Sequence, residues 1–477
     1  MAPLKVIIVG GGLAGACLAN GLINKATDPI EVLLFERDHE ASDRDGYQIR
    51  LGAHALTGFR ACLTERQYSD LLLCFGRSGG VVSSAPAIYS PEMDLLLDLG
   101  KFPAYTKSAP IGRARLRNFL QSPLREKSKI RYGKKFVRFE VLGSGDDSKE
   151  SRIRVHFEDG SGEDCDILVS AEGSGSRANK QLGCNNISAT SSLGAGSMLG
   201  KCHLPWTVLR ALPRPLLDKG TMFAATAKAT LFAAAYLPDS LSPSAQNASA
   251  ATDLKGIKKP SNYDEEQASL MVGVAWTEGL SSMEAAQLPD AKAFLRDKLM
   301  EAGFHAEYLK LIDALDPDAI QGVPFRTSSD TAVDWRRRLL EGEKASHRPE
   351  IGNPRVWLIG DAIHPMLPSR GMGANQALHD TADALGPLLA LAKRKSLTGT
   401  VSDEEVRLQL ETYENAMIPR AFTWVKRSAA QNLPGLDTFK GRAIIFVLRV
   451  GLVVVGAFME VRKLFGWKPT DDAPELR

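Results

Sequence analysis

The sequence predicts an α/β protein in which a parallel-sheet, Rossmann-type domain is joined to a second domain built on an antiparallel sheet and to C-terminal helices. Three observations lead to this prediction. An apolar strand near the N-terminus ends in a glycine-rich loop, and two later apolar strands, at 166–171 and 355–359, also end in loops of small residues. Between these two strands, residues 188–330 carry alternating, proline-punctuated stretches that indicate an antiparallel sheet.

The N-terminal stretch has the order of parts that a dinucleotide site requires. Val6–Val9 is an unbroken apolar run, as expected for a strand buried on both faces, and it ends in a G-x-G-x-x-G loop. In this motif Gly10 allows a tight turn, Gly12 lets the backbone approach a pyrophosphate, and Gly15 lets the helix pack closely on the strand. A second apolar strand ends at Glu36, whose carboxylate can accept a hydrogen bond from a ribose hydroxyl. We therefore predict that a dinucleotide binds here.

The composition and the cysteines narrow the class of protein. The chain has 477 residues, of which 44% are hydrophobic and 24% are charged, with a formal net charge of +3, so no nucleic-acid partner is expected. Six cysteines are scattered without a C-x-x-C pair, which favours a reducing, cytoplasmic compartment over a disulfide framework. No histidines stand at metal-ligand spacing, so no metal site is predicted. Phosphate binding explains the glycines of the first loop, which argues against a signal peptide.

The changes of pattern along the chain predict its domain organisation. The dinucleotide-binding domain is expected to begin the chain, to be interrupted by the second domain and to resume after it, because its strands recur on both sides. Within the second domain, the Ser-, Ala- and Pro-rich stretch 239–262 is expected to be a surface loop. The predicted division is 1–187 (with an insertion near 65–105 that joins the second domain), 188–330 for the second domain, 331–400 for the return segment, and 401–477 for the C-terminal helices.

Local patterns predict several further elements. Residues 45–51 alternate like a short strand and lead into a helix at 53–62. Residues 130–141 and 152–157 alternate as a pair of strands joined by a polar turn. In the second domain, strands are predicted at Trp206–Leu212, Thr221–Pro238 and Ser269–Thr277.

The segment 443–459 is apolar except for Arg449, with Arg442 before it and Arg462 and Lys463 after it. As a helix its 17 residues would rise about 25 Å, less than the roughly 30 Å of a bilayer's hydrocarbon core. A charge near the middle makes a membrane span costlier still. A packed terminal helix is the favoured interpretation, and contact with a membrane surface or a tail anchor is the alternative.

Three separated stretches together resemble the single-component (class A) FAD-dependent monooxygenases of the p-hydroxybenzoate hydroxylase fold. They are the first glycine-rich loop, the stretch Asp166–Arg177, and the stretch Gly360–Asn375. The resemblance implies that FAD is the dinucleotide and that Asp361 contacts its ribityl chain. It implies that the helix start at Gly373 and Ala374 places backbone N–H groups near the flavin ring, where a helix N-terminus stabilises negative charge.

The resemblance also implies cofactor contacts outside these three stretches. Arg113 lies in an Ile-x-Arg-x-x-Leu pattern that in this family contacts the phosphate or the ribityl chain, and Gln48, in the predicted strand at 45–51, is included among the cofactor contacts. One position departs from the family pattern, because Glu172 stands before Gly173 where the motif usually has aspartate. No second G-x-G-x-x-G unit exists for NAD(P)H, in agreement with a family in which the nicotinamide visits transiently.

The resemblance implies a reaction as well. NAD(P)H would reduce FAD, O₂ would add to the flavin, and the resulting C4a-hydroperoxide would transfer one oxygen atom to a substrate. We expect a hydrophobic aromatic or terpenoid-type small molecule, because the second domain is rich in apolar residues, and such enzymes often serve fungal secondary metabolism. The candidate catalytic and substrate contacts are Arg210, Tyr236 and Trp276, on predicted strands of the second domain.

Two other functions remain open at this stage. The same scaffold serves flavin-dependent dehydrogenases, reductases and halogenases, although the tryptophan-rich signature and the early lysine of a halogenase are not found. The chain could instead be a membrane-attached FAD-binding protein without oxygenase turnover, held by the segment 443–459. Substrate-stimulated NADPH consumption with and without O₂ separates these functions.

Overall fold

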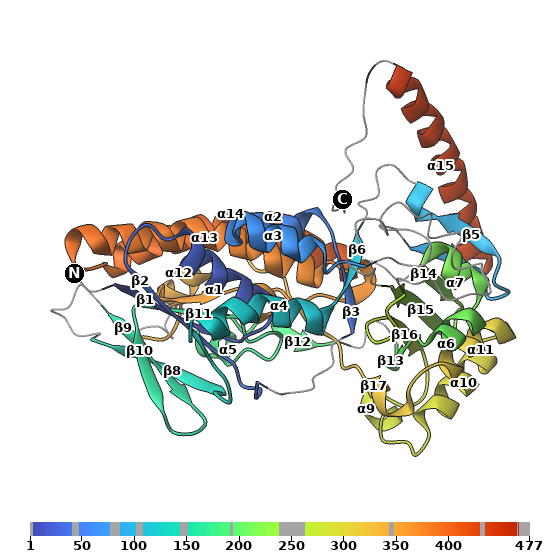
Figure 1. Ribbon diagram of the computed structural model, residues 1–477, viewed down its shortest axis with the longest axis horizontal. Coiled ribbons are helices and arrows are strands. Elements are labelled where there is room, and N and C mark those ends of the chain that lie inside the picture. Colours follow the sequence, from blue (N-terminus) through green and yellow to red (C-terminus); the bar gives the residue numbers. More distant parts are fainter. Residues whose placement is uncertain are drawn as a thin grey trace.

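The structure, a computed structural model, has two lobes, each built around its own β-sheet and its own apolar core (Figure 1). It describes residues 3–40, 47–76, 86–101, 108–143, 151–190, 194–237, 263–342, 348–429, 435–464 and 466. The stretch 239–262, predicted to be a surface loop, lies outside these residues, and so do residues 45 and 46 of the strand predicted at 45–51.

The first lobe is organised around a five-stranded parallel sheet. Its central strand pairs on both sides, with Val6 opposite Ile167 in one neighbour and opposite Val32 in the other. The strands are apolar along their length because both faces of the sheet are covered. Parallel strands end at the same edge, so the loops after the first, fourth and fifth of these strands in the chain meet there. In sheet order the strands are β19 (Val356–Leu358), β11 (Ile167–Ser170), β1 (Leu4–Val9), β2 (Ile30–Phe35) and β7 (Ile130–Arg131).

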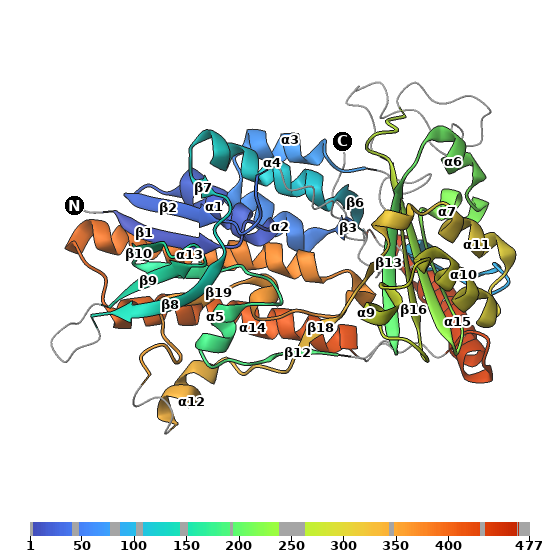
Figure 2. The same cartoon turned by 90° about the horizontal axis from the view of Figure 1, so that it is seen from below.

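Helices cover one face of this sheet and a small antiparallel sheet covers the other (Figures 1 and 2). The long α13 packs against both α1 and α2, and α14 runs beside α13. The pairing predicted for 130–141 with 152–157 is confirmed for residues 136–142, whereas residues 130–131 form a separate strand of the parallel sheet. The helices are α1 (Leu13–Lys25), α2 (Ala53–Cys62), α3 (Glu65–Leu72), α4 (Arg113–Glu126), α5 (Arg177–Gln181), α12 (Trp335–Glu341), α13 (Gly373–Thr398) and α14 (Asp403–Ala429), and the small sheet contains β8 (Phe136–Leu142), β9 (Arg152–Phe157) and β10 (Gly162–Cys165).

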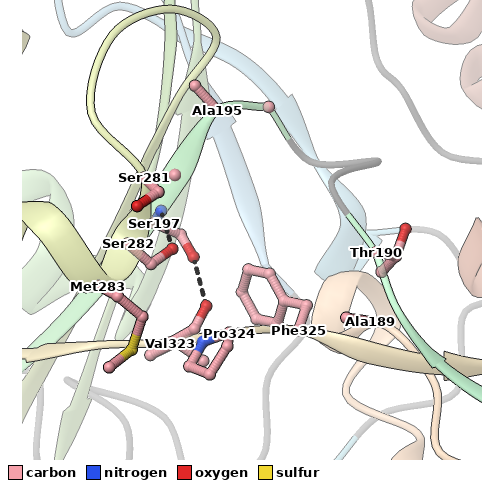
Figure 3. Close-up of a pocket in the computed structure, with 12 residues that line it drawn as sticks. Ala189, Thr190, Ala195, Ser197, Ser281, Ser282, Met283, Val323, Pro324 and Phe325 are labelled. Atoms are coloured by element: carbon pink, nitrogen blue, oxygen red, sulfur yellow. Dashed lines mark hydrogen bonds between the residues drawn. The ribbon is translucent and has the colours of Figure 1, made fainter.

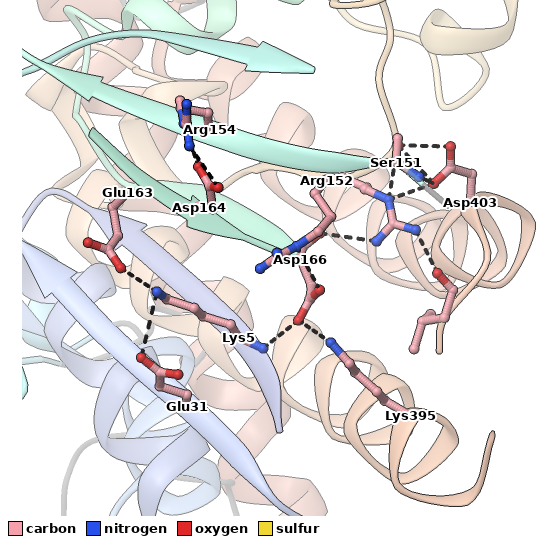
Figure 4. A network of polar contacts seen from close by, with 12 residues as sticks. Lys5, Glu31, Ser151, Arg152, Arg154, Glu163, Asp164, Asp166, Lys395 and Asp403 are labelled. Carbon is pink, nitrogen blue, oxygen red and sulfur yellow. Dashed lines mark hydrogen bonds and ion pairs between the residues drawn. The ribbon is translucent and has the colours of Figure 1, made fainter. Parts of the chain in front are cut away.

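A polar network fastens the parallel sheet at the end opposite its glycine-rich loops (Figure 4). The Asp166 carboxylate accepts hydrogen bonds from the Lys5 backbone N–H at 2.7 Å and from the Lys395 ammonium at 2.6 Å. The buried Arg355 guanidinium binds Asp403 at 2.5 Å and also donates to the Ser151 hydroxyl. These contacts tie the first residues of β1, β11 and β19 to α13 and α14, so they serve stability at the edge away from the loops.

The second lobe is organised around a seven-stranded sheet. All its neighbouring strands are antiparallel except β4 and β14, which are parallel, so the antiparallel sheet expected from the sequence contains one parallel pair. Residues 87–98 contribute two of its strands, although they precede most of the lobe in the chain. In sheet order the strands are β17 (Gln321–Gly322), β13 (Gly196–His203), β16 (Ser269–Trp276), β15 (Ala229–Tyr236), β14 (Thr221–Ala225), β4 (Ala87–Tyr89) and β5 (Leu95–Asp98).

Short helices cover the face of this sheet that points away from the first lobe (Figure 2). Their apolar residues form the second core with the inner faces of β13 to β16. These helices are α6 (Trp206–Ala211), α7 (Arg214–Lys219), α9 (Ser282–Ala285), α10 (Ala291–Glu301) and α11 (Ala306–Asp313).

The strand predicted at Trp206–Leu212 is wrong, because the structure has helix α6 there. Alternation over seven residues does not separate a strand from two helical turns when prolines stand on both sides. Pro205 precedes the first helical residue, and Trp206 and Leu209 share the buried face at the helical spacing of three. The segment therefore covers the sheet instead of joining it.

Two small antiparallel pairs connect the lobes. One pairs β3 (Gln48–Leu51) with β6 (Ala109–Gly112), and the other pairs β12 (Ile187–Ala189) with β18 (Arg326–Ser328). In the second pair the Ser328 backbone N–H also donates to the Pro365 carbonyl at 2.9 Å. The loop after β19 is thereby fixed against the connection to the seven-stranded sheet.

The last helix, α15 (Phe439–Leu464), stands apart from both cores along the outer strand β5 (Figure 1). The favoured expectation for this segment was a packed terminal helix. This expectation is wrong for most of the side chains, since Ile445 is the one described side chain of the helix that is buried, in a small cluster with residues of β4, β5 and β14. Among the described residues, α15 is the one helix that is long and apolar enough to cross a membrane by length and composition.

Candidate cofactor and substrate site

The glycine-rich loop after β1 has the shape that a pyrophosphate requires. Gly10 has φ of +107°, and a Cβ there would lie 2.2 Å from the Ala171 carbonyl oxygen, so only glycine fits. A Cβ on Gly15 would lie 2.1 Å from the Gly10 carbonyl oxygen, which shows how closely α1 packs on the strand. A Cβ on Gly12 would meet nothing within 4 Å, and Gly12 caps α1 without any side-chain hydrogen bond. Free space therefore lies in front of an uncapped helix N-terminus, where anions bind.

Glu36 lies beside this loop at the end of β2. Its Oε2 atom accepts a hydrogen bond from the Gly11 backbone N–H at 2.7 Å, and its Oε1 atom accepts one from Asp38 at 2.9 Å. The Gln121 side chain holds the other side of the loop by donating to the Gly11 carbonyl at 2.6 Å. The carboxylate thus supports the loop itself, and each oxygen keeps a lone pair for a ribose hydroxyl.

Asp361 and the start of α13 meet at the loop after β19. Asp361 lies in the short 3₁₀ turn η4 (Gly360–Ala362), and its Oδ1 atom is 3.9 Å from the Cβ position of Gly373. Gly360 lies against Ala14 of α1, because a Cβ on Gly360 would be 3.9 Å from the Ala14 Cβ. The residues expected from the first loop and from the Gly-Asp stretch are therefore neighbours in space.

The charge environment of Asp361 links it to Arg113. Asp361 keeps some solvent-exposed surface. The protein packed around its carboxyl group nevertheless desolvates that group, and this desolvation raises its pKa. The charges of His364 and Arg113 partly oppose that shift. Arg113 is the first residue of α4, and its guanidinium lies over the Tyr47 ring, 5.7 Å from the ring centroid. The cation expected to contact FAD therefore faces the same site as Asp361.

The first turn of α13 is held open by Asn375. Gly371 has φ of +62°, and the N-cap Met372 makes no side-chain capping bond. The Asn375 amide accepts from the Gly52 N–H at 2.8 Å and donates to the Arg50 carbonyl at 2.9 Å. These bonds tie the helix start, with Gly373 and Ala374, to β3. The sequence pattern did not single out Asn375, because its partners lie more than 320 residues away in the chain.

A buried ionic network lies directly behind Asp361. The Asp380 carboxylate accepts from the Gly360 backbone N–H at 2.7 Å, from His364 Nε2 at 2.6 Å, and from Arg420 at 2.7 Å. Arg420 also binds Asp383 at 2.8 Å. Burial alone would lower the pKa of His364, but the charge and hydrogen bond of Asp380 raise it. Burial would raise the pKa of Asp380, but His364 and Arg420 hold it low.

Where the two lobes meet, Gln48 and Tyr236 lie between the parallel-sheet lobe and β15. The Gln48 amide donates to the Ala234 carbonyl, and among the described residues no group donates to its buried Oε1 atom. The Tyr236 hydroxyl donates to the Cys74 carbonyl and accepts from Arg115, both at 3.1 Å. Burial raises the pKa of Tyr236. Both residues therefore lie where a cofactor and a substrate would have to meet.

Arg210 and Trp276 do not reach this boundary. Arg210 was expected on a strand facing the substrate, but it is exposed on the outer helix α6, so this prediction is wrong. Trp276 is buried in the second core, packs edge-on against Phe294 and donates to the Leu280 carbonyl at 2.7 Å. Of the three candidate substrate contacts, only Tyr236 lies between the lobes.

Glu172 stands where the family pattern in the stretch 166–177 usually has aspartate, and the structure shows which groups its longer side chain binds. Its Oε2 atom accepts from the hydroxyls of Ser170 and Ser176, both at 2.9 Å, and from the Ala178 N–H at 3.1 Å. Its Oε1 atom accepts from the Arg177 N–H at 3.2 Å. The longer side chain turns back onto its own loop and caps α5.

A cavity of about 390 Å³ lies between the end of β12, the start of β13, the start of α9 and residues 323–325 (Figure 3). It lies near the loop after β19, because Ser328, three residues beyond the cavity residue Phe325, binds Pro365. No charged side chain is among the described residues that line the cavity. Its lining comprises Ala189, Thr190, Gly194, Ala195, Gly196, Ser197, Ser281, Ser282, Met283, Val323, Pro324 and Phe325.

Comparisons with known proteins agree with this geometry. Residues 327–428, which contain Asp361 and the start of α13, match a family model described as an FAD binding domain. The dual O-methyltransferase/FAD-dependent monooxygenase elcB of Phaeosphaeria nodorum is 26% identical over 455 residues, covering 89% of this chain and 45% of that protein. The FAD-dependent monooxygenase sor5 of Hypocrea jecorina is 22% identical over 431 residues, covering 90% of this chain and 84% of sor5.

Solved structures share the fold across the whole chain. Klebsiella pneumoniae HpxO, complexed with FAD and uric acid, superposes with a TM-score of 0.62 at 18% identity, covering 94% of this chain and 92% of HpxO. CtdE in complex with FAD superposes with a TM-score of 0.60 at 15% identity, covering 96% of this chain and all of CtdE. The chain is thus similar in sequence to FAD-dependent monooxygenases, and it shares its fold with FAD-binding proteins of known structure.

FAD is accordingly the cofactor of this flavoprotein. The residues present fit the group, since the space in front of Gly12 admits a pyrophosphate and the unpartnered Gln48 Oε1 points to a missing donor. The chain spans about half the length of the curated relatives that it matches first, at 45% of each dual enzyme.

Proposed function

We propose that the protein is an FAD- and NAD(P)H-dependent monooxygenase that inserts one oxygen atom from O₂ into a neutral, hydrophobic aromatic or terpenoid-type small molecule. The observation that carries this proposal is the meeting of the N-terminal glycine-rich loop with a segment about 350 residues further along the chain, which holds both Asp361 and Gly373. The loop at Gly12, the turn at Asp361 and the start of α13 at Gly373 lie together on the side of the first lobe that borders the seven-stranded sheet.

In this proposal each segment holds one part of the cofactor. The N-terminus of α1 at Gly12 binds the pyrophosphate, and Glu36 accepts a hydrogen bond from the ribose. Asp361 and Arg113 hold the ribityl chain, and the amide ends of α13 at Gly373 and Ala374 stabilise negative charge at the ring. Gln48 and Tyr236 border the reacting side. Bound FAD supplies the oxygen activation, so the protein need only orient the substrate and exclude water.

The uncharged cavity supports a neutral substrate. A volume of about 390 Å³ lies within the usual range for small-molecule pockets. Apolar side chains such as Met283 and Phe325 offer contact area, and hydroxyls such as that of Ser197 offer a few polar contacts. A carboxylate substrate would find no cationic partner among the described lining residues, which would leave its charge costly to bury.

The decisive experiment uses the FAD-loaded protein with NADPH and isotope-labelled O₂. A panel of neutral aromatic and terpenoid compounds, with charged phenolic acids as comparison, should yield products that carry one labelled oxygen atom. NADPH oxidation that continues without O₂ and yields unlabelled product would instead identify a reductase or dehydrogenase. Turnover of the charged acids alone would refute the substrate class.

A matched pair of exposed methionines tests the cavity. Met283 lines it and Met300 lies on the outer helix α10, and both are about half exposed, at 55% and 50%. Met283→Lys should raise KM for neutral substrates by roughly tenfold, because a charge enters an apolar lining. Met300→Lys should leave KM unchanged. Equal effects of the two substitutions would remove the cavity from the substrate path.

For the cellular setting we propose a reducing, cytoplasmic compartment and a role in secondary metabolism. All six cysteines are free, and burial raises the pKa of Cys165 and Cys184, which makes them poor nucleophiles. Contact with a membrane through the C-terminal apolar segment is part of the same proposal. Disruption of a gene for this chain in its host, followed by metabolite profiling, tests the metabolic role.

A further inference from the structure

The outer side of α15 is a long apolar surface that no other described part of the chain covers. Five of its large side chains, Phe446, Val447, Val453, Val454 and Phe458, are each between 60% and 73% exposed. Within Phe439–Met459 an 18-residue window has a mean hydropathy of 2.2, and 11% of that window is buried. Soluble monomers rarely expose a contiguous apolar surface of this extent, so it marks an interaction site.

The inner side of α15 is attached to the edge of the seven-stranded sheet. Ile445 packs into a small cluster with residues of β4, β5 and β14, and Leu452, seven residues on, packs partly against it. Arg449 donates to the backbone carbonyls of Leu95, at 2.8 Å, and Leu96. The edge strand β5 therefore satisfies the one charge inside the apolar segment, and the opposite face of the helix carries none.

The hydrogen bonds of Arg449 to β5 indicate whether α15 would cross a membrane or lie in its plane. A helix that crossed a bilayer would have to leave β5 and carry the charged Arg449 side chain into hydrocarbon without those carbonyls, which is unfavourable. A helix that lies in the plane of the membrane keeps both hydrogen bonds. Its 26 residues extend about 39 Å, which lays a continuous apolar strip along a surface.

The charges at the two ends of α15 indicate that its apolar face binds an anionic lipid surface. Lys440 and Arg442 stand at the start of the helix, and Arg462 and Lys463 outnumber Glu460 at its end. No aspartate or glutamate occurs from 439 to 459. Basic residues near an anionic lipid surface are attracted to it, so both ends of the helix favour such a surface.

A second copy of the chain suits this face less well. Antiparallel pairing of two α15 helices would place the basic start of one against the basic end of the other. Parallel pairing would place each basic cluster against itself. Like charges in contact disfavour both arrangements, whereas an anionic bilayer satisfies both ends at once.

We infer that α15 is an in-plane membrane anchor, which lays the β5 edge of the second lobe on an anionic bilayer through its Phe446–Phe458 face while Arg449 remains bound to the protein. This inference stands apart from the catalytic proposal, because it concerns only the outer helix. It holds whether or not the protein oxidises any substrate.

The test is flotation of the full-length, FAD-loaded protein with vesicles of phosphatidylcholine, alone or mixed with phosphatidylglycerol. The wild-type protein should float with the mixed vesicles. Val454→Glu with Phe458→Glu should reduce the bound fraction at least about tenfold, because two apolar side chains no longer enter the lipid. The matched control, Leu397→Glu with Leu408→Glu, places the same charges on exposed leucines of α13 and α14 and should bind like the wild type.

Further measurements distinguish an in-plane anchor from a folding defect, a membrane-spanning helix and a dimer interface. Lys440→Glu with Arg442→Glu should lower binding to mixed vesicles more than to phosphatidylcholine alone. Equal thermal unfolding midpoints for the outer-face and control variants exclude a folding defect. The inference is overturned if the wild type remains unbound with both vesicles, or if it resists carbonate extraction as a spanning helix does. It is also overturned if the outer-face variant merely converts a dimer into a monomer, as measured by analytical ultracentrifugation.

Discussion

Replacing Gly12 by alanine should separate cofactor binding from folding. The backbone at Gly12 has φ of −69° and ψ of −167°, an extended conformation that alanine adopts easily. An added methyl group would meet no protein atom within 4 Å. The free energy of unfolding of the FAD-free protein should therefore change by less than about 1 kcal/mol, the cost of alanine at a helix N-cap.

The affinity for FAD should fall steeply in the same variant. The methyl group would occupy the space in which the pyrophosphate approaches the N–H groups of α1. Loss of two hydrogen bonds to a charged group, at about 1.5–3 kcal/mol each, costs about 3–6 kcal/mol. That cost corresponds to a dissociation constant roughly 10² to 10⁴ times higher.

The assay is titration of FAD-free protein with FAD, followed by flavin fluorescence, beside thermal unfolding of the same samples. Gly386→Ala is the matched control, because Gly386 lies inside α13 and an added methyl group there also meets nothing within 4 Å. Gly15→Ala is the contrast, since its methyl would lie 2.1 Å from a carbonyl oxygen and should unfold the protein. If Gly12→Ala binds FAD as tightly as Gly386→Ala, the pyrophosphate does not lie on Gly12.

Three further predictions concern the residues around this loop. Asp380→Asn removes the charge that faces His364 and Arg420, and it should lower the free energy of unfolding in urea by about 3–5 kcal/mol; a loss below about 1 kcal/mol would mean that the network is not needed. The raised pKa of His364 contributes stability that is fully present below its ordinary value of 6.5 and is lost as pH rises through the higher folded value, so His364→Gln should flatten the pH dependence of unfolding above pH 6.5. Tyr236→Phe should raise KM or lower kcat for a turned-over substrate severalfold, whereas Arg210→Ala, on an exposed helix, should change neither by more than about twofold.

Much of the candidate cofactor site could be predicted from the sequence because the patterns that indicate it lie within short segments of the chain. The turn at Gly10 and the packing at Gly15 follow from steric rules over six residues, and the structure finds both positions closed to a Cβ. Asp361 and Gly373 are only twelve residues apart, so their meeting required just one strand end and one helix start. Apolar runs likewise predicted the buried parallel strands.

Other features depend on partners that a linear pattern does not reveal. The bonds of Asn375 to Gly52 and Arg50 span more than 320 residues. The burial of Asp380 beneath the Asp361 turn depends on α14 lying beside α13. The segment Trp206–Ala211 is so short that its pattern of apolar residues fits a strand and a helix equally well. It forms a helix because this places its apolar side chains against the sheet.

The sequence by itself determined the buried parallel strands and the glycines that close the first loop, because backbone sterics and the periodicity of burial act over a few residues. Only the tertiary structure decided which side chains face one another between the lobes, and it excluded Arg210 while retaining Tyr236. It also decided that Arg449 turns to β5 and leaves one side of α15 apolar. Such choices depend on packing and desolvation between residues far apart in the chain, where local propensity has no influence.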